Sequence, residues 1–315
     1  MNLLTFFRDR REARASKLYD EGWELIEERS FGDALKIGRK LRKLNFIGAF
    51  EIEGLAYAGL DRHGDAVRVL REGLALAPAA WPNWQLLGSC LSDLQRYDEA
   101  LLAYDRAEAC EGSDLSQIDL NRAIVASRQN DHERSLQLLD KIRDYESREI
   151  QLRAISQRVR ALHGLGRDGE AEDLGTRTLN VWRDASEDEG QNAVASIASE
   201  IALIRQRRGD DRKELLAFAI DWWQRTRNES LLWTIREVRM ERSSNAKHFN
   251  LRLHAPGVYL GVDAVADSPE EALAFVRELE PEPFAIDDVK SVAPADQPKG
   301  IYYVSARVFY EEATS

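Results

Sequence analysis

Small residues that recur at a fixed spacing limit the fold of this 315-residue chain more than any other feature. In the stretch "WQLLGSCLSDLQRYDEALLAYDRA", residues 84–107, Gly88 precedes Ala100 by 12 positions. Gly54 precedes Ala66 by the same 12 positions, and the two pairs are offset by 34 residues. Two antiparallel helices approach closely only where the facing side chains are small. Each pair therefore predicts a helical hairpin with its crossing at the small residues.

The pattern continues on both sides of these two copies. The second anchor residue of each copy recurs with steps of 32, 34, 35, 36 and 43 residues, at Ala34, Ala66, Ala100, Ser135, Ala171 and Glu214, and five of these six residues are small. Polar turns such as "DRHGDA", "QRYDEA" and "GRDGEA" separate the halves of the copies. One hairpin cannot cover its own apolar faces, so neighbouring copies are expected to stack. A solenoid of hairpins is therefore favoured over an irregular all-α globule.

These spacings and residue types resemble the tetratricopeptide repeat (TPR) family. The match is strongest over residues 47–114, where the Trp, Leu-Gly, Ala, aromatic and Ala positions of the motif are present. With the flanking copies it extends over about residues 15–226, although Gly38, Val159 and Gly175 depart from the family pattern in size. The resemblance implies a right-handed helical-hairpin solenoid with a concave groove lined by the first helix of each repeat.

After the repeats, "NESLLWTIREVRMERS" has apolar residues at helical spacing and predicts a helix that closes the solenoid. Its apolar positions are Leu231, Leu232, Ile235, Val238 and Met240. Three tryptophans lie nearby, Trp222, Trp223 and Trp233. We interpret them as a buried capping contact rather than an aromatic binding site, because tryptophan hides a large apolar area.

From about residue 247 the periodicity changes from helical to alternating. "HFNLRLH" and "VYLGVDAVA" predict two strands, and "PEPFAIDDVKSV" and "GIYYVSARVFYEE" predict two more. Between the pairs, "DSPEEALAFVREL" predicts a helix with Ser268 as its N-cap. The order β-β-α-β-β predicts a small antiparallel sheet with one helix on one face.

These patterns predict a mainly α protein with three parts. Residues 1–14 form a basic helical lead-in, residues 15–245 form the TPR-like α-solenoid with its closing helix, and residues 246–315 form a small α+β domain. At about 70 residues the last part is near the lower size limit for independent folding, so we expect it to dock on the solenoid.

The formal net charge of −11 disfavours nonspecific binding to nucleic acid or anionic membranes, because both are polyanions, so we expect no nucleic-acid partner. The charge is uneven: residues 1–45 have 11 Lys/Arg against 8 Asp/Glu, and residues 249–315 have 5 against 12. The two ends can therefore attract one another between copies, which predicts self-association. The first 15 residues contain no apolar run long enough for a signal peptide or membrane span, so we expect a cytoplasmic protein without membrane insertion.

No motif that carries catalytic or cofactor chemistry is present. The chain lacks a P-loop, a G-x-G-x-x-G after a strand and a G-x-S-x-G elbow, and its two cysteines have no nucleophile context. His248, His254 and Asp263 match no common ligand spacing. We therefore predict no catalytic residue, no cofactor and no metal site, that is, a protein that is not an enzyme.

The predicted groove is where binding residues are expected. Its inward-facing polar positions are Glu51, Gln85, Ser89, Asp93, Asn121, Arg128, Ser156, Arg160 and His163. This mixed set suits hydrogen bonds to a peptide backbone or to short polar side chains. TPR proteins that bind a chaperone's C-terminal carboxylates use a Lys/Asn/Arg set at positions where this chain has Glu51, Gln85 and Ser89, so that specific function is not expected.

Three functions remain open from the sequence. The first is a scaffold or adaptor that binds a protein or peptide in the solenoid groove. The second is a regulator switched by a ligand bound between the solenoid and the C-terminal domain. The third is an enzyme with an unrecognised site in the C-terminal domain.

Overall fold

Two compact units make up the chain, residues 1–144 and 145–315, each with its own apolar core. The computed structural model describes residues 3–142, 147–182, 190–256, 258–280, 282–305 and 308–309. The predicted domain boundary between residues 245 and 246 lies inside the second unit and stays a prediction.

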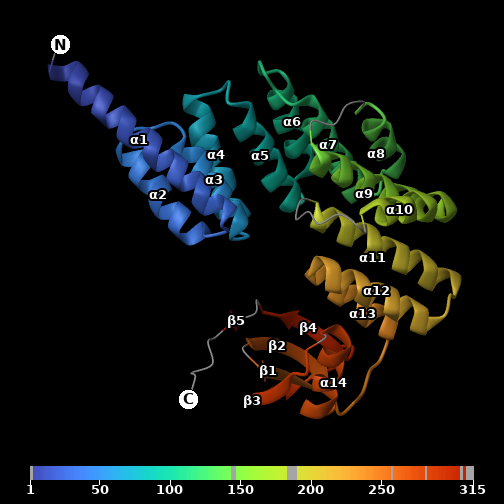
Figure 1. The fold of residues 1–315 in the computed structure, drawn as a ribbon. Coiled ribbons are helices and arrows are strands. Elements are labelled where there is room, and N and C mark those ends of the chain that lie inside the picture. Colours follow the sequence, from blue (N-terminus) through green and yellow to red (C-terminus); the bar gives the residue numbers. More distant parts are fainter. Residues whose placement is uncertain are drawn as a thin grey trace. The chain divides into compact units, whose positions relative to one another are not determined.

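The first unit consists of four antiparallel helical hairpins (Figure 1). Their first helices are α1 (Leu3–Glu27), α3 (Ala49–Gly59), α5 (Trp81–Asp93) and α7 (Leu115–Arg128). Their second helices are α2 (Phe31–Lys43), α4 (His63–Leu76), α6 (Tyr97–Glu108) and α8 (His132–Leu139). The predicted lead-in, residues 1–14, falls within α1 and its two preceding residues.

The small residues lie where the helices of this unit meet. Ala34, Ala66, Ala100 and Ser135, one on each second helix, are all 0% exposed. A Cβ atom on Gly88 would lie 2.5 Å from Cε1 of Tyr104, a distance that real Cβ atoms do not reach. Only glycine therefore permits this approach of α5 and α6.

One departure from the family pattern has a local cause. A Cβ on Gly38 of α2 would lie 2.5 Å from Cγ of Glu53 on α3. Because Gly38 has no side chain, the long side chain of Glu53 fits against α2 at this point. The Oε2 of Glu53 accepts a hydrogen bond of 2.9 Å from Nε of Arg42. Burial raises the pKa of Glu53, and the nearby Arg42 opposes that shift.

The same turn joins the two helices of every hairpin. One residue per turn has a left-handed backbone, with φ of 60°, 57°, 59° and 61° at Arg29, Asp61, Gln95 and Asn130. The N–H of the next residue donates back to a carbonyl five positions earlier, as from Arg96 to Leu91 at 2.8 Å. This is the Schellman ending of a helix. These left-handed residues are 32, 34 and 35 positions apart, the same steps as the small residues.

The second unit continues with five helices before its sheet. They are α9 (Arg148–Gly164), α10 (Asp168–Trp182), α11 (Gln191–Arg208), α12 (Arg212–Thr226) and α13 (Glu229–Arg239). Left-handed Gly166 and Gly209 repeat the Schellman turn between α9 and α10 and between α11 and α12. Ala171 of α10 is fully buried, as the repeat predicts.

The sixth predicted anchor, Glu214, is wrong, because this residue does not occupy the buried position of its helix. Glu214 is exposed in the first turn of α12, where the side chain of Asp211 accepts a hydrogen bond from its N–H. The other second helices begin two residues after the left-handed residue of the turn, but α12 begins three residues after Gly209. This one-residue extension puts Leu215, which is 4% exposed, at the buried position.

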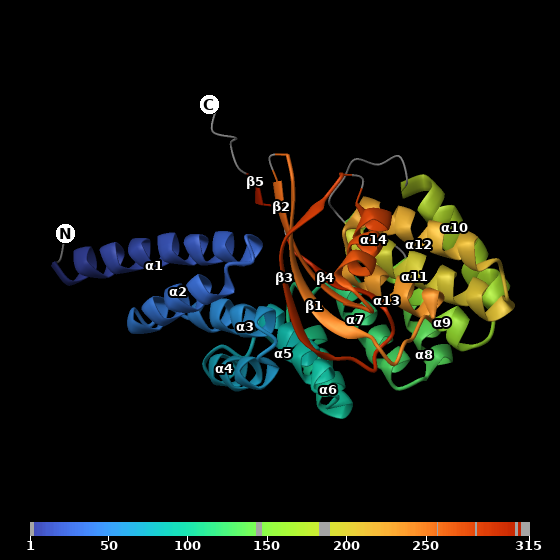
Figure 2. The same ribbon diagram turned by 90° about the horizontal axis from the view of Figure 1, so that it is seen from below.

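A five-stranded antiparallel sheet completes the second unit. Its strands are β1 (Lys247–Ala255), β2 (Val258–Ala266), β3 (Ala285–Pro294), β4 (Gly300–Val304) and β5 (Val308–Phe309), with α14 (Pro269–Leu279) between β2 and β3. The order across the sheet is β3-β1-β2-β4, and β5 also pairs with β2 (Figure 2). The predicted order β-β-α-β-β is confirmed, with the last strand divided into β4 and β5. Ser268 caps α14 by accepting from the N–H of Glu271 at 3.2 Å.

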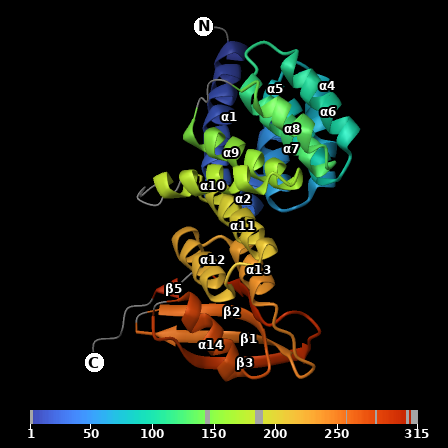
Figure 3. The same ribbon diagram turned by 90° about the vertical axis from the view of Figure 1, so that its right-hand side faces the viewer.

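The sheet shares one apolar core with the helices that precede it. Alternate residues of β1 and β2, such as Phe249 and Leu260, belong to the same buried cluster as Trp223 of α12 and Leu231 of α13. Helices α12, α13 and α14 lie on the same side of the sheet, as Figures 2 and 3 show. The sheet is therefore packed on the last helices of its unit.

Two of the three clustered tryptophans form the predicted buried contact. Trp222 and Trp223 are 3% and 2% exposed. Trp233 is 48% exposed, so its assignment to the buried contact is wrong. It lies on the side of α13 opposite to the buried Leu231 and Ile235. Met240, predicted as apolar packing, is also exposed because it ends α13 in a left-handed conformation.

Candidate functional site

A cavity of about 270 Å³ lies on the first helices of the first unit. Its walls come from three consecutive hairpins, because α1, α3 and α5 each contribute. The lining residues are Trp23, Glu51, Leu55, Pro82, Gln85, Leu86 and Ser89. The structure thus brings together three of the sequence-predicted site residues, Glu51, Gln85 and Ser89.

The carboxylate of Glu51 is held in place from α1. Its Oε2 accepts a hydrogen bond of 2.6 Å from the Oη of Tyr19. Burial, together with this hydrogen bond, raises the pKa of Tyr19 to about 12. Tyr19 therefore stays a neutral donor at physiological pH and keeps one carboxylate oxygen of Glu51 occupied.

The apolar part of the cavity surrounds this carboxylate. Trp23 is half-buried, and its ring meets that of Tyr19 edge to face, with centroids 6.4 Å apart and an interplanar angle of 84°. Leu55, Pro82 and Leu86 complete the apolar lining. The sequence prediction missed these residues because it selected polar positions only. The place of Trp23 directly after Gly22, a small residue of the repeat, is the signal that could have found it.

Ser89 is tied to the hairpin that carries it. Its Oγ donates to the carbonyl of Gln85 at 3.2 Å and shares a hydrogen bond of 3.3 Å with the Oη of Tyr104. Burial raises the pKa of Tyr104 to about 12. The position of Ser89 in the cavity wall is thus coupled to the packing of α5 against α6.

Two further predicted residues form an ion pair beyond the cavity. Nη1 of Arg128 on α7 lies 2.7 Å from Oδ1 of Asp93 on α5 and donates to Oγ of Ser92 at 2.8 Å. Asn121 is 5% exposed and accepts a hydrogen bond from Gln117. These three predicted residues already bind protein groups, so a ligand would have to compete with those contacts.

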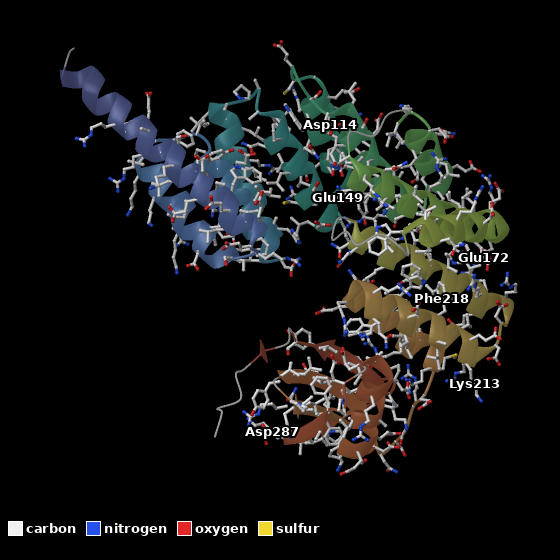
Figure 4. All side chains as sticks on the ribbon, in the orientation of Figure 1. Asp114, Glu149, Glu172, Lys213, Phe218 and Asp287 are labelled. Carbon is white, nitrogen blue, oxygen red and sulfur yellow. The ribbon has the colours of Figure 1, made fainter. Side chains whose placement is uncertain are left out.

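The last three predicted residues lie on α9 in the second unit. Ser156 is 3% exposed. Nε of Arg160 donates to Glu200 at 2.9 Å, and Nδ1 of His163 lies 2.7 Å from Oδ1 of Asp168. Further ion pairs join the following helices: Glu172 of α10, labelled in Figure 4, binds Arg205 and Arg208 of α11.

An open depression of about 570 Å³ lies where the segment after α13 meets the end of β3. Its lining residues are Arg242, Ser243, Ser244, Pro294, Ala295 and Asp296. Nη1 of Arg242 donates to the backbone carbonyl of Asp296 at 2.8 Å. The depression therefore lies between the segment that joins α13 to β1 and the end of β3.

The described residues contain no group of three or more His, Cys, Asp or Glu side chains arranged to hold a metal ion. Of the three residues considered from the sequence, Asp263 accepts a hydrogen bond from Asn250 on the neighbouring strand. Cys90 is 1% exposed, and burial raises the pKa of its thiol to about 12, so it packs as an apolar side chain. Among the helices that the structure describes, none is long and apolar enough to cross a membrane.

Stacked hairpins with buried small residues and a repeated Schellman turn define a TPR-like helical repeat fold. No family model matches the chain, and no curated protein matches it in sequence. Solved structures with this fold do match, and the TPR repeat predicted from the sequence is confirmed at the level of the fold.

The quorum sensor NprR from B. thuringiensis, in its apo form, has a TM-score of 0.58 and 15% identity, over 73% of this chain and 72% of that one. A tetratricopeptide repeat protein from Parabacteroides merdae has a TM-score of 0.56 and 14% identity, over 72% and 84%. The APC/C hetero-tetramer Cut9–Hcn1 has a TM-score of 0.57 and 13% identity. The match covers 71% of this chain but only 42% of that one. At these identities the likeness concerns the fold alone.

Proposed function

We propose that this protein is a non-enzymatic scaffold or adaptor that binds a peptide segment of a partner protein on the first helices of its first unit. The observation that supports the proposal is the cavity, because side chains from α1, α3 and α5 converge on it. A ligand in this place contacts three repeats at once. Among the similar structures, Cut9–Hcn1 is an assembly of different chains, so this fold takes part in protein binding there.

The size of the cavity favours a peptide side chain over a free small molecule. Small-molecule pockets usually measure roughly 300–1,000 Å³. The cavity measures about 270 Å³, which suits one anchoring side chain of a longer ligand. Gln85 lies in its wall, and its side-chain amide can bind the adjoining peptide backbone. Most of the affinity of such a ligand would come from a few buried anchors.

Site-specific photo-crosslinking tests this proposal. A photoreactive phenylalanine analogue replaces Gln85 in the cavity wall, and in a matched control it replaces Leu102, which is 64% exposed on the second helix α6. Both proteins are irradiated in their native cells. Adducts are digested and the attached peptides are sequenced by mass spectrometry.

We expect adducts from position 85 that map to one short segment of one or a few partners, and no such segment from position 102. Equal adducts from both positions, or none from position 85, would overturn the proposal. Circular dichroism of both proteins should match that of the unmodified chain, because neither side chain belongs to the buried core.

The depression lined by Arg242 and Asp296 supports a second candidate, a regulator switched by a small ligand. A ligand that binds only the folded state raises the melting temperature as its concentration increases. In a thermal-shift screen, a hit that stabilises the chain but not its Arg242→Ala variant would favour this function. Stabilisation of both proteins alike would contradict it.

A further inference from the structure

We propose that the cavity between α1, α3 and α5 binds the cationic side chain of a lysine or arginine in the partner peptide. This inference rests on the proposed peptide-binding function and names the residue that anchors the ligand. The charge, the hydrogen bonds and the aromatic wall of the cavity support it.

Among the described residues, the negative charge of the cavity has no ion-pair partner. Glu51 is the one charged residue among its seven lining residues. No described Lys, Arg or His forms an ion pair with Glu51, whereas other carboxylates of the unit do have such partners. Glu53 pairs with Arg42 at 2.9 Å and Asp93 with Arg128 at 2.7 Å.

The hydrogen bond from Tyr19 orients this carboxylate. Because Tyr19 bonds Oε2, the second oxygen, Oε1, has no hydrogen bond from the described residues. A carboxylate that binds a cation through one free oxygen forms a charge-assisted hydrogen bond, roughly twice as strong as a neutral one. The site is therefore preorganised for a donor with a positive charge.

The walls of the cavity match the remainder of a basic side chain. Lysine and arginine bury their aliphatic stems along apolar surfaces and keep the charged group at a polar end. Leu55 and Leu86 provide such an apolar surface. Trp23, the preferred aromatic partner of a cation, stands beside Glu51 in the lining.

Other peptide side chains fit this cavity less well. An acidic side chain would be repelled by Glu51. An apolar side chain would cover the carboxylate without pairing its charge, and burial of an unpaired charge is costly. The charge of the cavity thus selects the cation, and its apolar walls favour the long stem.

The first experiment is a selection of displayed random dodecapeptides on the full chain, on Glu51→Gln and on Glu133→Gln. The Glu51→Gln side chain can still accept the hydrogen bond from Tyr19, so the fold is expected to persist. Glu133 is exposed on α8 and does not line the cavity, so its variant controls for the change in net charge. We expect enrichment of one Lys or Arg position with the parent chain and with Glu133→Gln, and no such enrichment with Glu51→Gln.

The second experiment uses one selected peptide and its copy with norleucine at the basic position. In fluorescence anisotropy, norleucine should weaken binding to the parent chain about tenfold or more, as expected for a hydrogen bond to a charged group. It should have little effect on binding to Glu51→Gln. This non-additivity assigns the coupling to the two groups.

Three outcomes decide the matter. Selected peptides without a basic position overturn this inference and leave the proposed peptide binding standing. Equal losses on norleucine substitution in the parent chain and in Glu51→Gln also overturn it, because the cation would then bind elsewhere. Failure to select any peptide, by a chain whose circular dichroism is that of the folded protein, contradicts both proposals.

Discussion

Replacing Gly88 by alanine adds one methyl group where the two helices of the third hairpin meet. The new Cβ would lie 2.5 Å from Cε1, 2.8 Å from Cδ1 and 2.8 Å from Cζ of Tyr104. The Tyr104 ring is 2% exposed, and its Oη shares a hydrogen bond with Ser89. The ring therefore cannot move aside without disturbing its neighbours.

Two effects of opposite sign set the change in stability. Alanine is favoured over glycine inside a helix by roughly 0.5–1 kcal/mol. Overpacking of a close-packed core costs roughly 1–3 kcal/mol. The steric cost is the larger effect because the clash is with a buried ring, so we expect Gly88→Ala to lower the free energy of unfolding by about 0.5–2 kcal/mol.

Thermal unfolding followed by circular dichroism measures this change. For a chain of this size, 1 kcal/mol corresponds to a shift in Tm of roughly 2–4 °C. Gly64→Ala is the matched control, because Gly64 is also helical and a Cβ there meets nothing within 4 Å. The control should be unchanged or slightly more stable, while Gly88→Ala should melt several degrees lower.

Tyr104→Leu distinguishes the steric cause from a general loss of packing. Without the ring, the alanine methyl group has room, so the cost of Gly88→Ala should fall sharply in the double variant. If Gly88→Ala is as stable as the parent chain, or if its cost persists in the double variant, the proposed reason for glycine at this position is refuted.

Three further predictions concern the turns, the tyrosine and cysteine side chains with raised pKa values, and the sheet. Gln95 has a left-handed φ of 59°, so Gln95→Gly should relieve strain and raise the free energy of unfolding by up to about 1 kcal/mol in chemical denaturation; a decrease would contradict this. Tyr19, Tyr104 and Cys90 have pKa values raised to about 12 from 10.0, 10.0 and 9.0, so their neutral forms stabilise the fold. The stabilisation by the neutral side chains is complete below the pKa values of the unfolded chain, and it should be lost as the pH rises towards 12. A free energy of unfolding that stays constant between pH 9 and 12 would contradict this prediction. A chain that ends at Asn245 removes the sheet from the core it shares with α12 and α13, and it should bind a hydrophobic dye and aggregate; a monomeric, cooperatively folded product would show that the sheet is dispensable.

The repeat could be predicted from the sequence because its determinants are local. Small residues at a crossing and polar residues at a turn keep the same spacing in each copy, whatever lies around them. The left-handed residues from Arg29 to Gly209 repeat the predicted steps, including the long step of 43 residues. The error at Glu214 arose because one extra residue in a turn rotates the following helix, which spacing alone does not reveal.

The cavity could be predicted only in part. Glu51, Gln85 and Ser89 were expected on inward faces, and they do line it. Trp23 and Leu55 were missed, since an apolar residue on an inward face has the same sequence signal as one in the core. The hydrogen bond that orients the carboxylate of Glu51 comes from Tyr19, 32 residues away in the chain.

The sequence by itself determined the hairpins, their turns, the order of the last strands and the small residues at the helix crossings. These features follow from contacts within one repeat or one hairpin, so the local order of residues is enough. Only the tertiary structure decided which polar residues are already paired, and that the sheet shares a core with α12 and α13. It also decided that one oxygen of Glu51 receives no hydrogen bond from the described residues. Those properties depend on side chains from separate helices meeting in space, and the distances between them are set by packing rather than by position in the chain.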